Sequence, residues 1–375
     1  MKKVLLALPA LAIALMAVFA STGQSAQAAA VTLKVRAGDG QTGYAVNMFL
    51  PESIYLRAGD TVTWDFKWDE PHSVTFGEIA GNPELPSHPD TAVVDYDGTG
   101  YVNSGLVFPA PGGSSFSMKF TKEGNFDYFC FIHPMMTGKV YVQGEGIGEQ
   151  DTQVAIDARG TTTYNSAMAT LKGAAGQAAA KPVAVTGSGA GRKFTLQVSS
   201  PNDVAEGDVM QFFPASLNVG VNDSVEFVSS VHTPHDIVFP GPVDLNGPPP
   251  PGLDTFDPFT QSLNYTPGVK LDNSKPVISP MIGLDFPDGT KASFSFAKTG
   301  TYEYACLLHA SQGMVGKINV TSGAPLPPNT GQALAASQQS GASGLWIVFG
   351  AVGIAFAATG VAFDNPPVSP TSYRP

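Results

Sequence analysis

Two short segments of the chain each contain a cysteine, a histidine three residues later and a methionine shortly after. Well upstream of each segment lies a Pro-His pair. The residues that share this pattern are His72, Cys130, His133 and Met136 in the first set and His235, Cys306, His309 and Met314 in the second. Two imidazoles, a thiolate and a thioether are the soft, mixed ligands that suit copper in electron-transfer sites. We therefore expect two copper ions, one bound by each set.

The chain has only two cysteines, and each lies in one of these sets. In an oxidising compartment the default alternative is a disulfide between Cys130 and Cys306. A disulfide would not require both cysteines to have the same neighbours. The shared pattern therefore favours two metal sites.

The chain also contains an internal duplication. Residues 48–64 align without a gap with residues 211–227, and the same register places His72 on His235. A second ungapped match aligns the segments that end at Cys130 and at Cys306. Two units of one fold are therefore expected.

Each unit has the pattern of short strands. Apolar and polar residues alternate, for example over 61–64 and 116–120, and glycine-containing turns separate such runs. We predict an all-β chain with two tandem Greek-key β-sandwiches, over residues 31–145 and 192–322. Residues 146–191 form a linker rich in Ala, Gly and Ser, with a helical stretch over about 164–180. A proline-rich loop is expected over 240–258.

The two ends of the chain predict export and anchoring. Lys2 and Lys3 precede an apolar run and an Ala-x-Ala cleavage signature, so residues 1–30 are expected to be a signal peptide, cut after Ala28 or Ala30. An uncleaved anchor is the alternative. A stalk over 323–344 leads to an uncharged segment over 345–363, which is long enough for one transmembrane helix, and to a short cytoplasmic tail over 364–375. Residues 326–331 resemble a sortase signal with one residue too many, which leaves open whether this end is retained or processed.

The formal net charge of −11 argues against a nucleic-acid partner, because phosphate binding requires a basic surface. An acidic exterior instead favours partner proteins with basic docking surfaces. The chain is expected to meet them outside the cell membrane, in the periplasm or at the cell exterior.

Both units resemble cupredoxins, the plastocyanin and amicyanin family of blue copper proteins. The resemblance rests on Gly-x-(Phe/Tyr)-x-Tyr-x-Cys-x-x-His followed by Met-x-Gly-Lys, together with the upstream Pro-His. The first unit has the shorter amicyanin-like loop and the second the longer plastocyanin-like loop. The resemblance implies cupredoxin-like domains, type 1 copper and electron transfer. In the family an asparagine usually follows the first histidine and ties the ligand loops together, whereas here Ser73 and Asp236 follow.

Other residues compete for roles at the sites. Met135 is an alternative to Met136, but the alignment with the second unit favours Met136 as the ligand and leaves Met135 as apolar surface. His88 and His232 are expected in loops, and Trp64 and Trp68 in strand packing.

The leading hypothesis is an electron carrier that is not an enzyme, with the exposed edge of His133 or His309 as the port for electrons. Copper capture and delivery at the cell surface is the alternative. A multicopper oxidase or copper nitrite reductase needs further histidines, and only His88 and His232 remain uncommitted.

Overall fold

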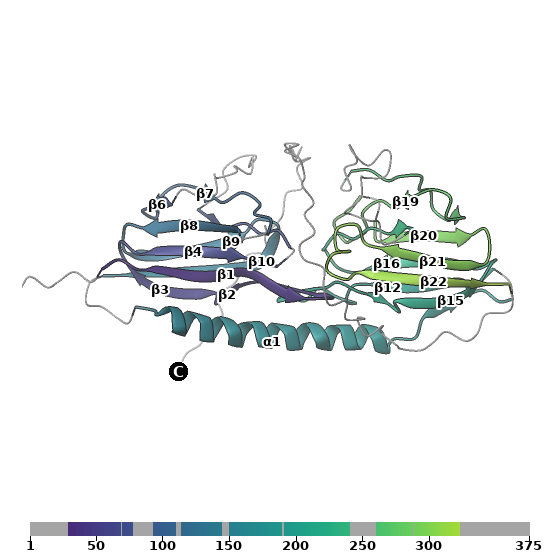
Figure 1. Cartoon of the computed structure of the whole chain (residues 1–375), viewed down its shortest axis with the longest axis horizontal. Coiled ribbons are helices and arrows are strands. Elements are labelled where there is room, and N and C mark those ends of the chain that lie inside the picture. Colours follow the sequence, from purple (N-terminus) through teal and green to yellow (C-terminus); the bar gives the residue numbers. More distant parts are fainter. Residues whose placement is uncertain are drawn as a thin grey trace, which may run out of the picture.

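The computed structural model describes residues 29–322, apart from 69, 78–92, 110–113, 145–149, 190, 241–259 and 288. In this part of the chain two β-sandwiches lie next to each other, and one long helix runs along the same side of both (Figure 1). The expected signal peptide, apart from its last two residues, and the expected transmembrane segment over 345–363 lie outside the described residues. Among those described, no helix combines the length and the apolar character that crossing a bilayer requires.

The first sandwich is built from two sheets. One contains, in spatial order, β13 (Gly207–Val209), β2 (Tyr44–Leu50), β1 (Thr32–Gln41), β4 (Thr61–Phe66), β8 (Ser114–Phe120) and β6 (Val94–Tyr96). The other contains β3 (Ser53–Arg57), β10 (His133–Gln143), β9 (Gly124–Cys130), β5 (Thr75–Phe76) and β7 (Val102–Asn103). Three strand pairs in this sandwich are parallel, namely β1–β4, β3–β10 and β6–β8, and the others are antiparallel.

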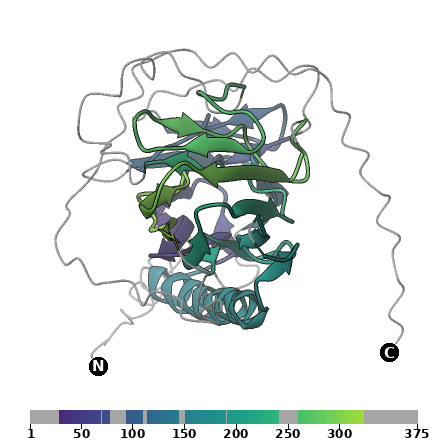
Figure 2. The same cartoon turned by 90° about the vertical axis from the view of Figure 1, so that its right-hand side faces the viewer.

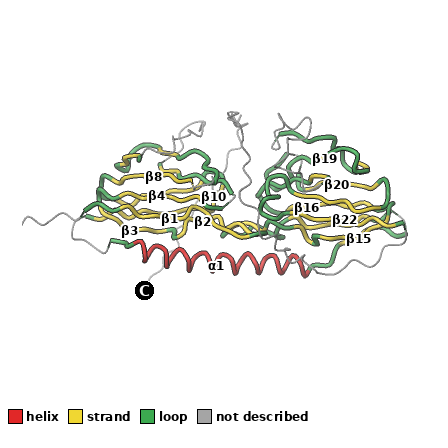
Figure 3. Tube along the Cα trace, in the orientation of Figure 1, coloured by secondary structure: helices red, strands yellow, loops and turns green. Residues whose placement is uncertain are grey.

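The second sandwich repeats this plan. One sheet contains β11 (Ala184–Thr186), β12 (Lys193–Val198), β16 (Ser224–Ser229), β20 (Lys291–Phe296) and β18 (Val269–Leu271), with β14 (Phe212–Phe213) paired to β12. The other contains β15 (Ser216–Gly220), β22 (Val315–Thr321), β21 (Gly300–Ala305), β17 (Val238–Phe239) and β19 (Val277–Ile278). The expectation of two β-sandwich domains is therefore confirmed (Figure 3).

Alternation of side chains along the strands produces the two cores. In β4 every second residue is buried, and the equivalent strand β16 has the same pattern. Trp64 on β4 packs edge-on against Tyr128 of the opposite sheet, with ring centroids 5.3 Å apart. At the corresponding place in the second domain Phe227 packs against Tyr304 at 4.9 Å. Trp64 therefore belongs to the core of the strands that hold the first candidate site, as predicted.

The linker contains a helix, α1 (Gln153–Ala180), that begins well before the predicted stretch over 164–180. Thr152 caps it by accepting a hydrogen bond from the Ala155 amide. Its buried face packs on residues of both domains; this cluster contains Ala167, Met168, Leu171, Ala175 and Ala178 of the helix, Val46 and Leu50 of the first domain, and Val209 and Phe213 of the second. Figure 2, which views the molecule from one end, shows the helix along one side of the sandwiches. The linker is thus a packed element that contacts both domains.

The two domains also share main-chain hydrogen bonds. Strand β13, from the second domain's part of the chain, pairs antiparallel with β2 and extends the first domain's sheet. Beside this pairing, the Gly43 amide donates to the Gln312 carbonyl at 2.7 Å. Sheet pairing and the helix together fix the relative placement of the two candidate sites.

Candidate metal centres

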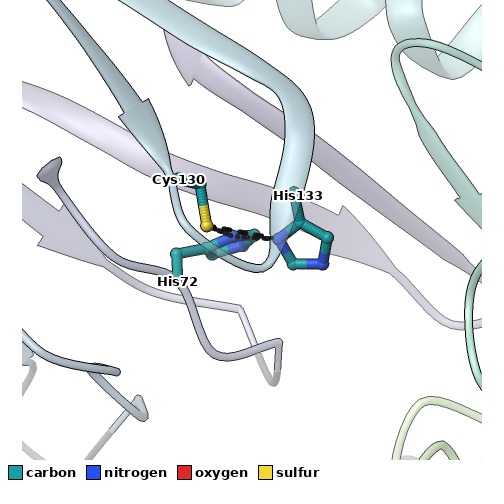
Figure 4. Close-up of side chains that lie close together, drawn as sticks. All are labelled: His72, Cys130 and His133. Carbon is teal, nitrogen blue, oxygen red and sulfur yellow. Dashed lines mark hydrogen bonds between the residues drawn. The ribbon is translucent and has the colours of Figure 1, made fainter. Parts of the chain in front are cut away.

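The first candidate site forms where two neighbouring strands meet a loop. Cys130 is the last residue of β9 and His133 the first residue of β10, and the two are partners in the β-ladder, just before a register shift. His72 lies after β4, where its backbone forms an isolated bridge with Val107. The Nδ1 atoms of His72 and His133 are 3.1 Å apart, and they lie 3.9 and 3.5 Å from the Cys130 Sγ (Figure 4).

The second candidate site has nearly the same geometry. Cys306 follows β21, His309 lies in the next turn, and the backbone of His235 bridges to Ile282. The two Nδ1 atoms are 3.2 Å apart, and the Cys306 Sγ lies 3.9 Å from that of His235 and 3.4 Å from that of His309. The structure therefore brings together three of the four residues expected at each site, across more than 50 residues of chain.

This donor set fits a single metal ion. In each triad the ligand atoms all lie within 4.8 Å of one another. Separations of this size are those of atoms that share one ion at bond lengths of about 2.0–2.3 Å. Imidazole nitrogen and thiolate sulfur together suit copper and zinc, and of these two metals only copper changes its oxidation state.

Burial keeps the histidines neutral, which is the form that binds a metal. Desolvation lowers the pKa of His133 to about 4 and that of His309 to about 3, the latter with a smaller contribution from His133. The pKa values of His72 and His235 lie well below the usual range, again because of burial and then of the neighbouring histidine. Each Nδ1 can therefore offer a lone pair at neutral pH.

The thiols behave in the opposite sense. Burial raises the pKa of Cys130, and backbone hydrogen bonds, first from Ser73, offset part of the rise. Burial raises the pKa of Cys306 still further from its ordinary value, and the neighbouring Asp236 charge adds to the effect. A buried thiolate is thus formed only with a compensating cation, so each site favours a bound metal ion over an exposed reactive thiol. Both cysteines are free, and no disulfide joins them.

The methionines separate into two classes. Met136 and Met314 are buried, each in the same core cluster as the cysteine of its domain. The backbone of Met314 also hydrogen-bonds to Cys306 and His309 at 3.1 Å. Met135, in contrast, is 69% exposed. This burial is consistent with Met136 at the metal and Met135 on the surface.

The ligand loops are tied together despite the missing asparagines. The Ser73 hydroxyl accepts a 2.7 Å hydrogen bond from the Phe131 amide, next to Cys130. In the second domain the Asp236 carboxylate accepts a 2.6 Å hydrogen bond from the Leu307 amide, next to Cys306. Burial raises the pKa of Asp236 to about 6. Both departures from the family pattern therefore retain the link between the two loops by using a side-chain oxygen as acceptor.

The glycines of the Met-x-Gly-Lys motifs lie against tyrosines of the cysteine strands. A Cβ atom added at Gly138 would lie 2.3 Å from the Tyr128 ring, and one at Gly316 would lie 2.3 Å from the Tyr304 ring. The two tyrosines are fully buried. The motif therefore includes glycine because the ring of the tyrosine two residues before each cysteine occupies the space of a side chain.

The expectation of an exposed edge is wrong for His309, which is buried, whereas His133 keeps a small exposed part. The side chains of His133 and His309 are only 16% and 7% exposed, because the two sites face each other across the domain interface. Between them lies Glu70, whose carboxylate is 3.7 Å from the His133 Nε2 and 3.5 Å from the His309 Nε2. Gln312 donates a 3.1 Å hydrogen bond to the same carboxylate.

Sequence reasoning missed Glu70, although the duplication contained a signal. In the register that aligns His72 with His235, Glu70 meets Thr233, so the acidic residue is present in one unit only. Gln312 likewise lies in the part of the second ligand loop that is longer than the first. Residues that break a repeat are where the two units can differ in role.

His232, one of the two uncommitted histidines, belongs to neither triad. His232 is exposed and pairs with Asp203, whose carboxylate lies 2.7 Å from its Nδ1. His88 lies outside the described residues. Trp68 packs against the core of the second domain and thus belongs to the interface, not only to strand packing.

The fold and the two triads define a pair of β-sandwich domains with copper-type donor sets. A family model for copper-binding proteins of the plastocyanin/azurin family matches residues 36–143 and 198–321, which together exceed half of the chain. The chain belongs to this family. Because the family binds copper, the two triads fit two copper sites.

Two similar proteins are each matched over nearly their whole length by a stretch of this chain about as long as one domain. The plastocyanin of Scenedesmus fuscus is 34% identical over 115 residues, which are 30% of this chain and 99% of the relative. Amicyanin-alpha of Methylorubrum extorquens is 29% identical over 134 residues, 36% of this chain and 97% of the relative. A solved structure of an amicyanin variant with methionine replaced by glutamine, in the Cu(I) form, aligns with a TM-score of 0.22 and 25% identity, covering 30% of this chain and 82% of that one.

Proposed function

We propose that this chain is an exported, membrane-anchored electron-transfer protein with two type 1 copper sites, one in each domain. The residues that would hold the ions are His72, Cys130, His133 and Met136 in the first domain and His235, Cys306, His309 and Met314 in the second. When bound, copper supplies one-electron redox chemistry by alternating between Cu(I) and Cu(II).

The single observation that supports this most is the convergence of two Nδ1 atoms and one Sγ in each domain. These atoms lie on a β-scaffold whose strands are fixed by their ladders, so the donors are held in place before a metal arrives. A preformed site changes little between two oxidation states, and small reorganisation favours electron transfer over bond chemistry.

The chain's own residues divide the remaining work. Ser73 and Asp236 hold the two ligand loops together at each site. Met136 and Met314 would supply a soft, weakly bound thioether that tunes the potential. The burial of His72 and His235 excludes water from the inner side of each site.

Location and partners belong to the same proposal. The apolar segments over 4–19 and 345–363 support export and anchoring, with both domains outside the membrane. The formal charge of −11 supports redox partner proteins with basic docking surfaces. Near the first site, the exposed Met135 supplies apolar surface for contact with them.

Metal analysis and visible absorption of the purified protein test this proposal. We expect two copper ions per chain and an intense thiolate-to-Cu(II) band. Electron self-exchange should be fast, whereas loss of copper to a chelator should be slow. Rapid copper loss with slow self-exchange would instead identify a copper-delivery protein, and steady consumption of oxygen or nitrite would identify an enzyme.

A further inference from the structure

A single carboxylate lies between the two candidate metal sites. Glu70 precedes the first ligand of the first domain by two residues, yet its Oε1 is 3.5 Å from the Nε2 of His309 in the second domain. Its Oε2 is 3.7 Å from the Nε2 of His133. Glu70 is 5% exposed. A carboxylate so deeply buried is stable only with donors around it, and one of its partners is the Gln312 side chain.

Metal binding at both sites would make His133 and His309 donors toward Glu70. In each ring Nδ1 faces the cysteine and the other histidine. With Nδ1 bound to a metal ion, the proton of the neutral imidazole would be on Nε2. Each Nε2–H therefore lies on the side of the carboxylate. The two separations are slightly longer than a hydrogen bond, and a shift of about half an ångström would bring both within hydrogen-bonding distance.

The other histidine of each site has no such partner. The Nε2 atoms of His72 and His235 are buried without a hydrogen-bond partner among the described residues. The contact with Glu70 thus distinguishes the two histidines that lie at the domain interface from the two that lie in the domain cores.

We propose that Glu70 is a positioning residue shared by both metal sites, which orients His133 and His309 and joins the sites into a pair that exchanges electrons within the molecule. This inference rests on the proposed function. In such an exchange one electron leaves one site and enters the other, so one is oxidised as the other is reduced and no further reactant is needed. Hydrogen bonds to the distal nitrogen of a ligating imidazole raise its basicity, so one carboxylate would adjust both sites at once.

The test compares Glu70→Gln with Glu226→Gln in the full, copper-loaded chain. Glutamine keeps the shape of the side chain and removes the charge. Glu226, on β16, pairs with Lys193 and Lys291 away from the triads and serves as the matched control. We expect the reduction potentials of both coppers to rise in Glu70→Gln, because a negative charge near each site no longer stabilises Cu(II), and neither to change in Glu226→Gln. A shift at one copper only, or at neither, would overturn the proposal.

A second measurement follows the exchange itself. After a light flash that reduces part of the copper, the electron should redistribute between the sites at a rate independent of protein concentration. This phase should be absent in Cys306→Ser, which retains one site, and about tenfold slower in Glu70→Gln. An unchanged rate in Glu70→Gln would reject the role of Glu70 in exchange.

Copper content and the thiolate band of each variant separate the two levels of inference. If the unmodified chain binds fewer than two coppers, the proposed function fails. If the unmodified chain binds two copper ions but their potentials and the exchange rate are the same in Glu70→Gln, only the shared role of Glu70 fails. If Glu70→Gln loses copper altogether, the potentials are measured in Gln312→Leu instead, which removes the amide that donates to the Glu70 carboxylate. If both potentials are unchanged in that variant, the proposal is rejected. A shift of both potentials would support it.

Discussion

The side-chain amide of Asn47 in the first domain donates a 2.7 Å hydrogen bond to the Asp208 carboxylate on the strand that the second domain adds to the first domain's sheet. The Thr233 hydroxyl donates to the other carboxylate oxygen. Burial raises the pKa of Asp208 to about 6, and the charge of Asp203 adds to the rise, while the hydrogen bonds from Thr233 and Asn47 oppose it. The joint between the domains therefore contains a group that ionises in the mildly acidic range.

Stability should consequently fall as Asp208 ionises. In the unfolded chain an aspartate has a pKa of about 3.9. Because the pKa in the folded chain is higher, the free energy of unfolding decreases as pH rises from about 4 to about 6. Above about pH 6 this loss of stability is complete. Asp208→Asn should therefore raise the midpoint of thermal unfolding at neutral pH, and the gain should shrink toward pH 4.

Asp97 provides a control of opposite sign. Hydrogen bonds from Lys122 and Thr99 lower its pKa to about 2, so its ionised form favours the folded chain above about pH 4. Asp97→Asn should leave stability unchanged or reduce it at neutral pH. Equal gains for Asp208→Asn at pH 4 and pH 7 would show that ionisation is not the cause.

The two cysteines should contribute independently to colour. Cys130→Ser and Cys306→Ser should each remove about half of the visible absorption and one copper, and the double variant should remove both. Absorption spectra and metal analysis of the three variants measure this. Complete bleaching by either single change would mean that one chain does not hold two independent sites.

Met136 and its neighbour Met135 should affect different properties. Met136→Leu should raise the reduction potential of the first site and leave its visible band, because the histidines and the cysteine still hold the metal. Met135→Leu should leave the potential unchanged, since that side chain is exposed. Spectroelectrochemistry of both variants decides, and a potential shift in Met135→Leu alone would exchange the two assignments.

Gly138 and Gly316 should each resist substitution. Alanine at either position would collide with the tyrosine of the neighbouring strand, so Gly138→Ala and Gly316→Ala should each lower the free energy of unfolding by about 1–3 kcal/mol. Gly173→Ala is the control, because this exposed helical position has open space around it and alanine favours helix by about 0.5–1 kcal/mol. Denaturant titrations compare the three. Stabilisation by all of them would contradict the predicted collision.

The sandwiches and the triads could be predicted because the information for them is repeated. Alternation over 61–64 indicates a strand wherever it is placed, and Cys130 and His133 lie close in sequence as well as in space. The duplication then carried His72 onto His235. Residues that are equivalent in two copies of one fold occupy equivalent places, so the second site followed from the first.

Contacts between the copies could not be predicted in this way. Nothing in the strand pattern of either unit indicates that β13 pairs with β2, or that Glu70 meets His309. Helix α1 was predicted only in part for a related reason. Much of its buried face is alanine, such as Ala167 and Ala175, and alanine in a linker is equally typical of an exposed helix. A helix face that packs through alanine cannot be recognised from the spacing of large hydrophobic residues.

Strand β13 covers the edge of β2, which would otherwise be the free edge of the first domain's sheet. Without β13, the peptide groups of Ala45 and Val46 could pair with a strand of another chain. Loss of α1 would in addition expose the side chains of Val46 and Leu50. Exposed apolar edges of this kind are sites of aggregation. A first repeat cut off before the helix is therefore expected to self-associate, whereas the uncut chain keeps this edge covered by its own second half.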